Sequence, residues 1–332
     1  MATRISANKE LASTLPRHKT RINPLPYLLI LPTLIFILMF TVYPTFNVLD
    51  DSQEYFHPNR PDRNRVTDLN LPGVEEADRS IRGPHDVGLA YFRAMFDFST
   101  PEGAVFKQVI TNTLVYTAIT VPVSMILALL FALLVNRTVA GIGFARVAFF
   151  YPTMLPLVSA ATIWLFFFTP EYGLWNTALR FFGYSGPENW IINRKLGLSA
   201  LMIVSIWKNA GYFMIFYLAG LQNLPQDVYE AAALDGAGWF TTMRRITLPL
   251  LRRTTLFVSV VAVINAFQNI DHALVLTNEL VTGEADLLLY EIFQQRFELQ
   301  NYGFANALTV VMIMMLLILT LANFFLSERS ND

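Results

Sequence analysis

Residues 224–249 read LPQDVYEAAALDGAGWFTTMRRITLP and lie between two long apolar segments. Pro225 suits the first turn of a helix, the acidic residues after it favour the positively polarised helix end, and alanine is the best helix former. Gly236 can adopt the left-handed backbone conformation that ends a helix. A second short helix is expected over residues 237–246 and should stop before Pro249. The stretch therefore predicts a compact helix-turn-helix.

The composition around this stretch is that of a membrane protein. Of the 332 residues, 54% are hydrophobic and 15% are charged, and the mean hydropathy is +0.43. Soluble domains usually contain more charged and fewer apolar residues. A net charge of −1, with no basic run among aromatic residues beyond residue 21, gives no indication of nucleic-acid binding.

Several kinds of chemistry are excluded by the residues that the chain lacks. There is no cysteine, which rules out disulfides, thiolate metal sites and thiol nucleophiles. The four histidines lie far apart in the sequence, without the spacing of metal ligands. Neither a G-x-x-x-x-G-K-[ST] phosphate loop nor a G-x-S-x-G nucleophile elbow occurs. No catalytic residue, metal or bound cofactor is therefore expected in this chain.

Six stretches are long and apolar enough to cross a membrane, which takes about 20 mostly apolar residues in a helix. The fifth is the weakest, because polar residues interrupt both of its ends, and it is kept because an even number leaves both termini on one side. The sequence predicts an all-α integral membrane fold with six transmembrane helices, at roughly 26–46, 108–135, 147–168, 199–221, 249–276 and 305–326.

Charge indicates the orientation of these helices. The basic N-terminal segment precedes an apolar stretch of full length without a small-residue cleavage motif, so the first span is expected to be retained. With the N-terminus in the cytoplasm, the inner segments hold 12 Lys and Arg in 75 residues, and the outer segments hold 11 in 119. The net charges are +6 inside and −7 outside. The positive-inside rule therefore predicts that both termini are cytoplasmic.

This orientation divides the chain into five parts and places the loop 222–248, between spans four and five, in the cytoplasm. The insert between spans one and two is acidic and rich in Pro, Asp and Arg, so it is either a solvated loop or a surface that touches a soluble partner. The expected parts are a cytoplasmic segment 1–25, the first span 26–46, an extracytoplasmic insert 47–107, a core of five spans 108–326 and a cytoplasmic tail 327–332.

The loop carries a spaced pattern as well. Glu230-Ala231-Ala232 is followed by three residues and Gly236, then by nine residues and Ile246, then by one residue and Leu248-Pro249. This pattern resembles the signature loop of permease subunits of binding-protein-dependent ABC importers. The resemblance implies a short coupling helix that docks into a cytoplasmic ABC ATPase dimer, which would bind ATP and Mg. The implied coupling residues are Glu230, Ala231, Ala232, Asp235 and Gly236.

Further segments are similar to carbohydrate-type permeases, and the loop looks most like the first permease of maltose and glycerol-3-phosphate importers. The resemblance implies a bacterial or archaeal inner membrane, a second homologous permease, an extracytoplasmic solute-binding protein and a small carbohydrate-like substrate. Residues 278–283 and Arg253 depart from the family pattern. The matching segments include Asn112-Thr113-Leu114, Asn136-Arg137, Phe149-Phe150-Tyr151-Pro152, Trp207-Lys208 and Gly220-Leu221-Gln222.

Polar side chains at membrane depth form a candidate substrate path. They are costly in lipid and usually face a bundle interior or a water-filled route, and amides and aromatic rings suit hydroxyl-rich solutes. They could equally hydrogen-bond between helices, with Lys208 paired to Asp271. The candidates are Asn112 and Tyr116 in span two, Lys208, Asn209 and Tyr212 in span four, and Asn265, Gln268 and Asp271 in span five.

Two other classes of function remain as alternatives. An ion-gradient-driven secondary transporter would show inverted repeats, broken helices and buried acids at matching places in both halves, and no such pairing is evident. An intramembrane enzyme would need a catalytic pair at membrane depth. Only Asp271 and His272 offer one, and adjacent residues point in different directions around a helix.

Overall fold

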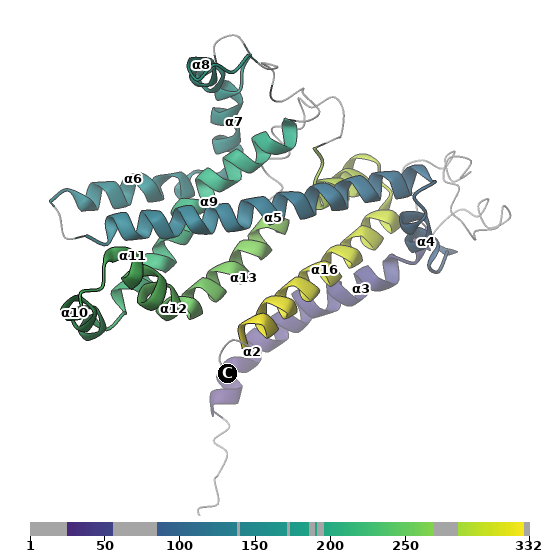
Figure 1. Ribbon diagram of the computed structural model, residues 1–332. Helices are drawn as coiled ribbons and strands as arrows, with labels where there is room; N and C mark the ends of the chain where they lie inside the picture. Colours follow the sequence, from purple (N-terminus) through teal and green to yellow (C-terminus); the bar gives the residue numbers. More distant parts are fainter. Residues whose placement is uncertain are drawn as a thin grey trace, which may run out of the picture. The chain divides into compact units, whose positions relative to one another are not determined.

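The computed structural model describes residues 25–55, 85–137, 140–170, 173–185, 190, 196–268 and 285–328. These residues are almost entirely helical (Figure 1), and the only strands among them are two short ones of two residues each. The chain divides into two compact units, residues 1–47 and residues 48–332.

The described part of the first unit is helical throughout. α2 (Leu25–Ile37) passes through a π-helical turn, η1 (Leu38–Val42), into α3 (Tyr43–Asp51). The turn lies just before Pro44, whose ring would clash with the carbonyl four residues earlier in a regular helix, and the Tyr43 amide instead bonds back five residues to Leu38. The helix that contains the predicted span 26–46 therefore continues five residues further, to Asp51.

Two long helices, α5 (Pro101–Val135) and α9 (Gly197–Gln222), pack along each other in the second unit (Figure 1). α9 matches the predicted span 199–221 closely. α5 begins seven residues before the predicted start at 108, because Thr100 caps it by accepting a hydrogen bond from the Gly103 amide at 3.1 Å. Small side chains on its buried face let neighbouring helices approach closely: Thr113, Thr117, Thr120, Ser124, Ala128 and Ala132.

Two further helices, α13 (Arg252–Gln268) and α16 (Tyr302–Glu328), pack against each other, and α13 also packs on α5 and α9. Asn323 joins the pair by donating to the Ser259 hydroxyl at 2.7 Å. α16 extends slightly beyond the predicted span 305–326 at both ends. The described part of the predicted span 249–276 is not one continuous helix, because the short helix α12 (Leu248–Leu250) and α13 meet at a bend of 67°. α13 covers the span up to Gln268, and residues 269–276 lie outside the described residues.

The predicted third span, 147–168, is wrong as one continuous helix. The chain forms α6 (Ile142–Met154) and α7 (Leu157–Phe167), which meet at a bend of 102°. Pro156 explains the break, because a proline disfavours helical geometry in the residue before it, and Leu155 has the extended angles φ −71° and ψ 133°. The described residues thus contain four helices long and apolar enough to cross a membrane, or up to six if each bent pair forms one span.

The described ends of the predicted insert 47–107 are ordered around α4 (Ala90–Phe96). The strands β1 (Glu54–Tyr55) and β2 (His85–Asp86) pair antiparallel, with Glu54 opposite Asp86. Tyr91 and Met95 of α4 are fully buried in one cluster with Phe304 and Leu308 of α16. The last third of the insert therefore packs on the helical core, while residues 56–84 lie outside the described part of the chain.

Four of the five tryptophans lie in another cluster, near α7 and α8 (Leu174–Phe181). Trp164 meets Trp175 and Trp207 edge to face at centroid distances of 6.1 and 5.7 Å, and Trp190 meets Trp175 at 6.0 Å. The Trp190 indole N–H donates to Asn176 at 2.8 Å. These rings thus join α7, α8 and α9, on which Trp164, Trp175 and Trp207 lie.

Candidate functional site

The stretch between α9 and α13 forms two helical arms. The first arm is α10 (Gln226–Leu234), and Pro225 stands immediately before its first turn. Gly236 has φ +74°, its amide donates to the Ala233 carbonyl at 3.1 Å, and the Ala237 amide donates to the Ala232 carbonyl at 2.9 Å. This pair of bonds is a Schellman motif, which ends helices at a left-handed residue. The bend predicted at Gly236 is confirmed.

The second arm is longer than predicted. It consists of α11 (Trp239–Thr242), the π-helical turn η3 (Met243–Thr247) and α12 (Leu248–Leu250), so the helix does not stop before Pro249. The Leu248 amide bonds back five residues to Met243, and this wider turn accommodates the proline ring. The direction changes only after Leu250, where the second arm and α13 meet at 67°.

A hydrogen bond joins the two arms. The Thr247 hydroxyl donates to the Thr242 carbonyl at 3.4 Å and accepts from the Tyr229 hydroxyl at 3.1 Å. Thr247 is 4% exposed, so this pair lies on the inner side of the hairpin. Neither residue belongs to the predicted site, because the pairing of positions 229 and 247 depends on the bend between them.

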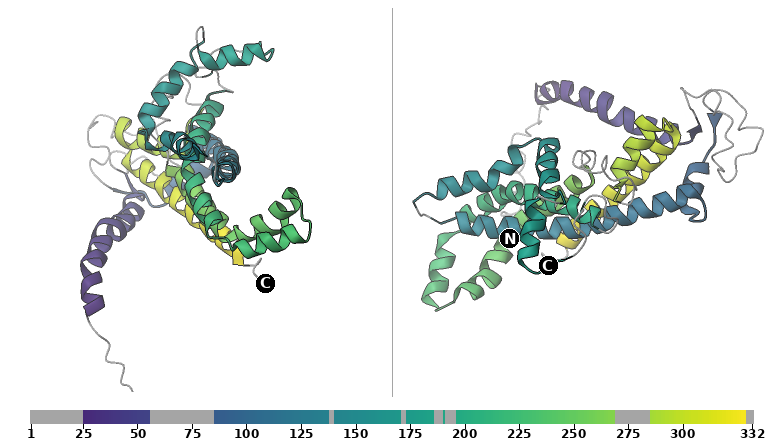
Figure 2. Two further views of the ribbon diagram at one scale, coloured as in Figure 1. Left: turned by 90° about the vertical axis from the view of Figure 1, so that its left-hand side faces the viewer. Right: turned by 90° about the horizontal axis from the view of Figure 1, so that it is seen from above.

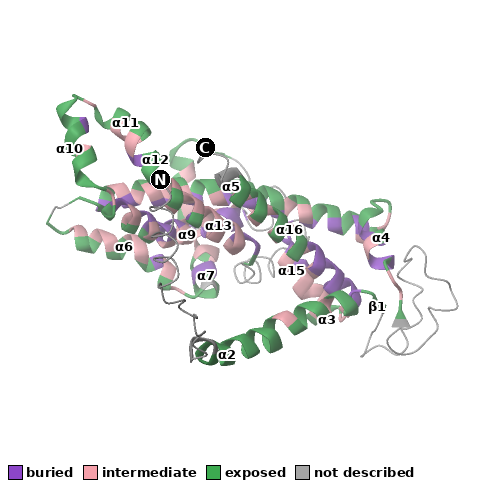
Figure 3. Ribbon diagram, turned by 90° about the horizontal axis from the view of Figure 1, so that it is seen from below, coloured by how far each residue is buried: buried purple, intermediate pink, exposed green. Residues whose placement is uncertain are grey.

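Much of the surface of both arms is open to solvent. Both arms, in green, project from the rest of the second unit in the two views of Figure 2, and much of α10 and α11 is exposed in Figure 3. Leu234, Trp239 and Phe240 are 90%, 70% and 68% exposed. Four of the five predicted coupling residues are exposed as well: Glu230, Ala231, Asp235 and Gly236. Ala232 differs, because it is only 8% exposed and lies on the inner side of α10.

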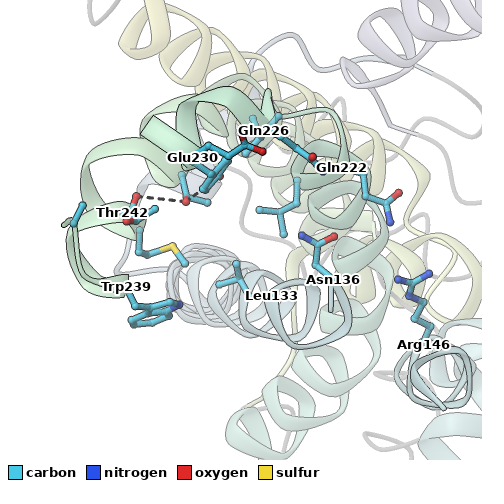
Figure 4. A pocket seen from close by; sticks show the side chains of 14 residues that line it. Leu133, Asn136, Arg146, Gln222, Gln226, Glu230, Trp239 and Thr242 are labelled. Atoms are coloured by element: carbon cyan, nitrogen blue, oxygen red, sulfur yellow. Dashed lines mark hydrogen bonds between the residues drawn. The ribbon is translucent and has the colours of Figure 1, made fainter. Parts of the chain in front are cut away.

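A cavity of about 780 Å³ lies between the arms and the adjoining helix ends (Figure 4). Asn136 follows the last residue of α5, Arg146 lies on α6 and Gln222 ends α9. Tyr229, Glu230 and Trp239 line it from the loop. Arg146 donates from Nε and Nη2 to the Val135 carbonyl at 3.2 and 2.9 Å, which caps the end of α5.

Three of the predicted path residues hydrogen-bond to other parts of the protein. Asn112 donates to the Asp286 carbonyl at 3.0 Å, and Tyr116 is fully buried and shares a hydrogen bond with the Ser205 hydroxyl on α9. The Lys208 ammonium donates to the Leu155 carbonyl at the break between α6 and α7. That carbonyl has lost its helical partner, and a cation at a helix C-terminus also favours the helix dipole.

The other predicted path residues that the structure describes lie on two helices and differ in burial. Asn209 and Tyr212 are half-buried on α9, where the Tyr212 ring lies 5.2 Å from that of Phe216. Asn265 is half-buried on α13, and Gln268 is exposed at the end of that helix. Asp271 lies outside the described residues, so its pairing with Lys208 stays a prediction.

An acidic segment that the sequence did not single out lies next to Asn112. Asp286 and Glu291 are each only 6% exposed, around the start of α15 (Leu288–Phe293). Burial raises the pKa of Asp286 to about 7, and the charges of Glu291 and Glu298 add to the effect. Burial also raises the pKa of Glu291, although a hydrogen bond from Gln295 opposes the shift. Among the described residues, no group of three or more His, Asp or Glu could hold a metal ion.

Comparisons with known proteins agree on one kind of molecule. A family model described as "Binding-protein-dependent transport system inner membrane component" matches residues 103–330. The trehalose/maltose transport system permease protein of Thermococcus litoralis is 32% identical over 63% of this chain and 70% of its own length. The arabinooligosaccharides transport system permease protein of Bacillus subtilis is 29% identical over 91% of this chain and 88% of its own length.

A third relative, the sn-glycerol-3-phosphate transport system permease protein of Salmonella typhimurium, is 28% identical over 90% of this chain and 92% of its own length. Among solved structures, a bacterial ABC transporter involved in the import of the acidic polysaccharide alginate contains a chain that superposes with a TM-score of 0.71. That likeness covers 93% of this chain and 96% of the other, at 21% identity, and it shows a shared fold.

Proposed function

This chain belongs to the family of binding-protein-dependent transport system inner membrane components, and from that membership we propose that it is the permease subunit of an ATP-driven importer for a carbohydrate or related polyol. The relatives support this class of solute, because their names specify trehalose and maltose, arabino-oligosaccharides, and sn-glycerol 3-phosphate. Those relatives are transport permeases and not enzymes. The alternatives of an ion-gradient-driven transporter and an intramembrane enzyme are therefore not favoured.

The arms between α9 and α13 are the proposed coupling element. The side chains of Leu234 and Phe240 are 90% and 68% exposed and do not line the cavity, and such exposed apolar groups are typical of a surface that meets another protein. The exposed residues Glu230, Ala231, Asp235 and Gly236 lie on the same hairpin. The exposure of these residues, next to the bend at Gly236, is the observation that best supports docking to a cytoplasmic ATPase dimer, which would bind ATP and Mg.

The proposed topology has six spans with both termini in the cytoplasm. The spans are α2–α3, α5, the bent pair α6–α7, α9, α13 with the residues after it, and α16. The insert 47–107 and the segments before α9 and α15 would then face the outside. There they would meet an extracytoplasmic solute-binding protein, while a second, homologous permease completes the pathway. The chain of the alginate transporter, whose structure includes a periplasmic protein, supports this assembly by its fold.

The polar residues of the proposed path divide into two groups. Asn112, Tyr116 and Lys208 have hydrogen-bond partners on other segments, so they are better assigned to holding the helices together. Asn209, Tyr212 and Asn265 are half-buried, and together with Gln268 and Asp271 they are the candidates that we retain for contact with a hydroxyl-rich solute.

A pair of glycines in the hairpin provides a test of the proposed coupling to the ATPase. A Cβ would meet no neighbouring atom at Gly236 or at Gly238, but Gly236 has φ +74° and Gly238 has φ −70°. Only Gly236→Ala forces an L-residue into the left-handed region, at about 1–2 kcal/mol. We expect this variant to lower the solute-stimulated ATPase activity of the assembled importer, and Gly238→Ala to leave that activity near the wild-type value. Equal activities of both variants would contradict the coupling proposal.

A further inference from the structure

The cavity between the arms and the helix ends has walls that belong to two parts of the transport machinery. Tyr229, Glu230 and Trp239 come from the proposed coupling hairpin, whereas Asn136 and Gln222 end the packed helices α5 and α9 (Figure 4). The bond between Tyr229 and Thr247 ties the two arms of the hairpin into one body. A molecule in the cavity would therefore touch the hairpin and the helices at the same time.

The lining has the chemistry of a site for a hydroxyl-rich solute. The amides of Asn136, Gln222 and Gln226 can each donate and accept hydrogen bonds, and the Glu230 carboxylate can accept them. Trp239 supplies an aromatic ring at the edge, against which the apolar face of a sugar ring can stack. The cavity of about 780 Å³ falls within the range of about 300–1,000 Å³ for small-molecule sites.

The charges in the lining favour a neutral solute over an anion. Arg146 directs two of its five donors to the Val135 carbonyl, so fewer N–H groups remain for a phosphate or carboxylate. Glu230 lines the same cavity and repels anions. A sugar without a charged group meets neither obstacle.

We propose that this cavity binds a neutral sugar from the cytoplasm, the product side of the importer, and that the bound sugar slows transport by fixing the hairpin against the ends of α5 and α9. The inference rests on the proposed function, because it takes the hairpin to be cytoplasmic and to couple ATP hydrolysis to transport. It adds a second sugar site, outside the transport path, through which accumulated product limits further uptake.

Direct binding tests the site without any partner subunit. Maltotriose is titrated calorimetrically into the full-length protein in detergent. We expect Trp239→Ala to weaken binding by about tenfold or more, because it removes the stacking ring. Phe240→Ala is the matched control, since Phe240 is 68% exposed beside Trp239 and does not line the cavity. Glycerol 3-phosphate is expected to bind about tenfold more weakly than maltotriose.

Three results of the titration would contradict the proposed sugar site or its preference for a neutral ligand. Absence of maltotriose binding to the wild-type protein overturns the proposal, and so does equal binding by the Trp239→Ala variant, which would place the sugar in the transport path. Tighter binding of glycerol 3-phosphate than of maltotriose would overturn the assignment of a neutral ligand.

The regulatory step is tested in the complete importer in nanodiscs, with solute-loaded binding protein in excess. Maltotriose is expected to lower ATP turnover of the wild-type complex and of the Asn223→Ala complex. Gln222→Ala should require about tenfold more maltotriose for the same fractional effect. Asn223 is adjacent and exposed, bonds to the Ala219 carbonyl at 2.9 Å and does not line the cavity. Each rate is divided by that of the same complex without maltotriose.

The two proposals fail in different ways in this experiment. If solute-loaded binding protein does not stimulate ATP turnover, the proposed function is wrong. If turnover is stimulated but does not respond to maltotriose, or responds equally in the Gln222→Ala complex, the proposed function stands and the second sugar site is wrong.

Discussion

α5 has an asparagine near its beginning and another just after its end, and the two have different surroundings. Asn112 donates to the Asp286 carbonyl, and its neighbour Thr113 accepts from the buried Leu288 amide at 2.8 Å. Asn136 instead lines a cavity together with Gln222. Polar groups of the same kind thus hold segments together at one end of the helix and remain accessible to a ligand at the other. The amino-acid type alone does not distinguish these two roles.

The largest loss of stability is expected from removing the charged group that hydrogen-bonds to the backbone at the break between α6 and α7. Lys208→Met removes the donor to the Leu155 carbonyl, and we expect a loss of about 1.5–3 kcal/mol, typical of a hydrogen bond to a charged group. Thermal unfolding in detergent measures the loss, and Lys208→Arg, which keeps the charge, should restore most of it. If the Lys208→Met variant is more stable than the wild-type protein, Lys208 does not hold segments together and belongs with the polar residues that remain accessible to a ligand.

Removal of the Thr113 hydroxyl should cause the next largest loss of stability. Thr113→Val leaves the buried Leu288 amide without its acceptor, which costs about 1–3 kcal/mol. Thr111→Val is the control, because Thr111 is exposed and its hydroxyl donates only within its own helix, to Lys107 at 2.7 Å. Similar unfolding temperatures for the two variants would show that the bond to residue 288 does not stabilise the fold.

The acidic segment beside Asn112 should make stability depend on pH. The pKa of Asp286 is raised from 3.8 to about 7, so the folded protein holds a proton that the unfolded chain releases above about pH 4. This contribution is fully present below the unfolded pKa and is lost as the pH rises through about 7. Unfolding temperatures should therefore fall from pH 5 to pH 8 in the wild-type protein. Asp286→Asn should reduce this slope, and an unchanged slope would rule out Asp286 as its source.

The smallest effect on stability is expected at the accessible end. Gln222 is exposed at the end of α9, and substitutions at such positions usually change stability by less than about 0.5 kcal/mol. Gln222→Ala should therefore unfold within about 1–2 °C of the wild-type protein. A large loss would mean that Gln222 holds the helix ends together as Thr113 does, and the contrast between the two ends of α5 would disappear.

Much of the fold could be predicted because apolar length and local capping signals determine it. The limits of α9 lie within two residues of the predicted span, and the bend at Gly236 depends only on bonds among residues 232–237. An apolar window does not detect the break at Leu155, although Pro156 marks it, because the window counts residues without regard to backbone geometry. The sequence does not predict the continuation past Pro249 either, because a π-helical turn can absorb a proline.

The candidate site was less predictable because roles depend on neighbours that are distant in sequence. Lys208 reaches a carbonyl 53 positions away, and Asn112 reaches one 174 positions away. Ala232 fits the signature pattern, yet it is only 8% exposed, whereas Ala231 and Ala233 on either side of it are exposed. The cavity was not foreseen, because it forms only when the ends of three helices meet the hairpin.

The π-helical turns before Pro44 and Pro249 change the direction in which side chains point around the helix axis on either side of the turn. Each turn holds one residue more than a regular α-helical turn, and one residue corresponds to about 100° of rotation. Side chains before and after such a turn therefore do not continue the same stripe. In the second arm, Trp239 precedes the turn and Leu248 follows it, so the face that carries Trp239 is independent of the face that leads into α13. The second arm can thus carry Trp239 on the face that lines the cavity and Leu248 on a different face, within one continuous helical segment.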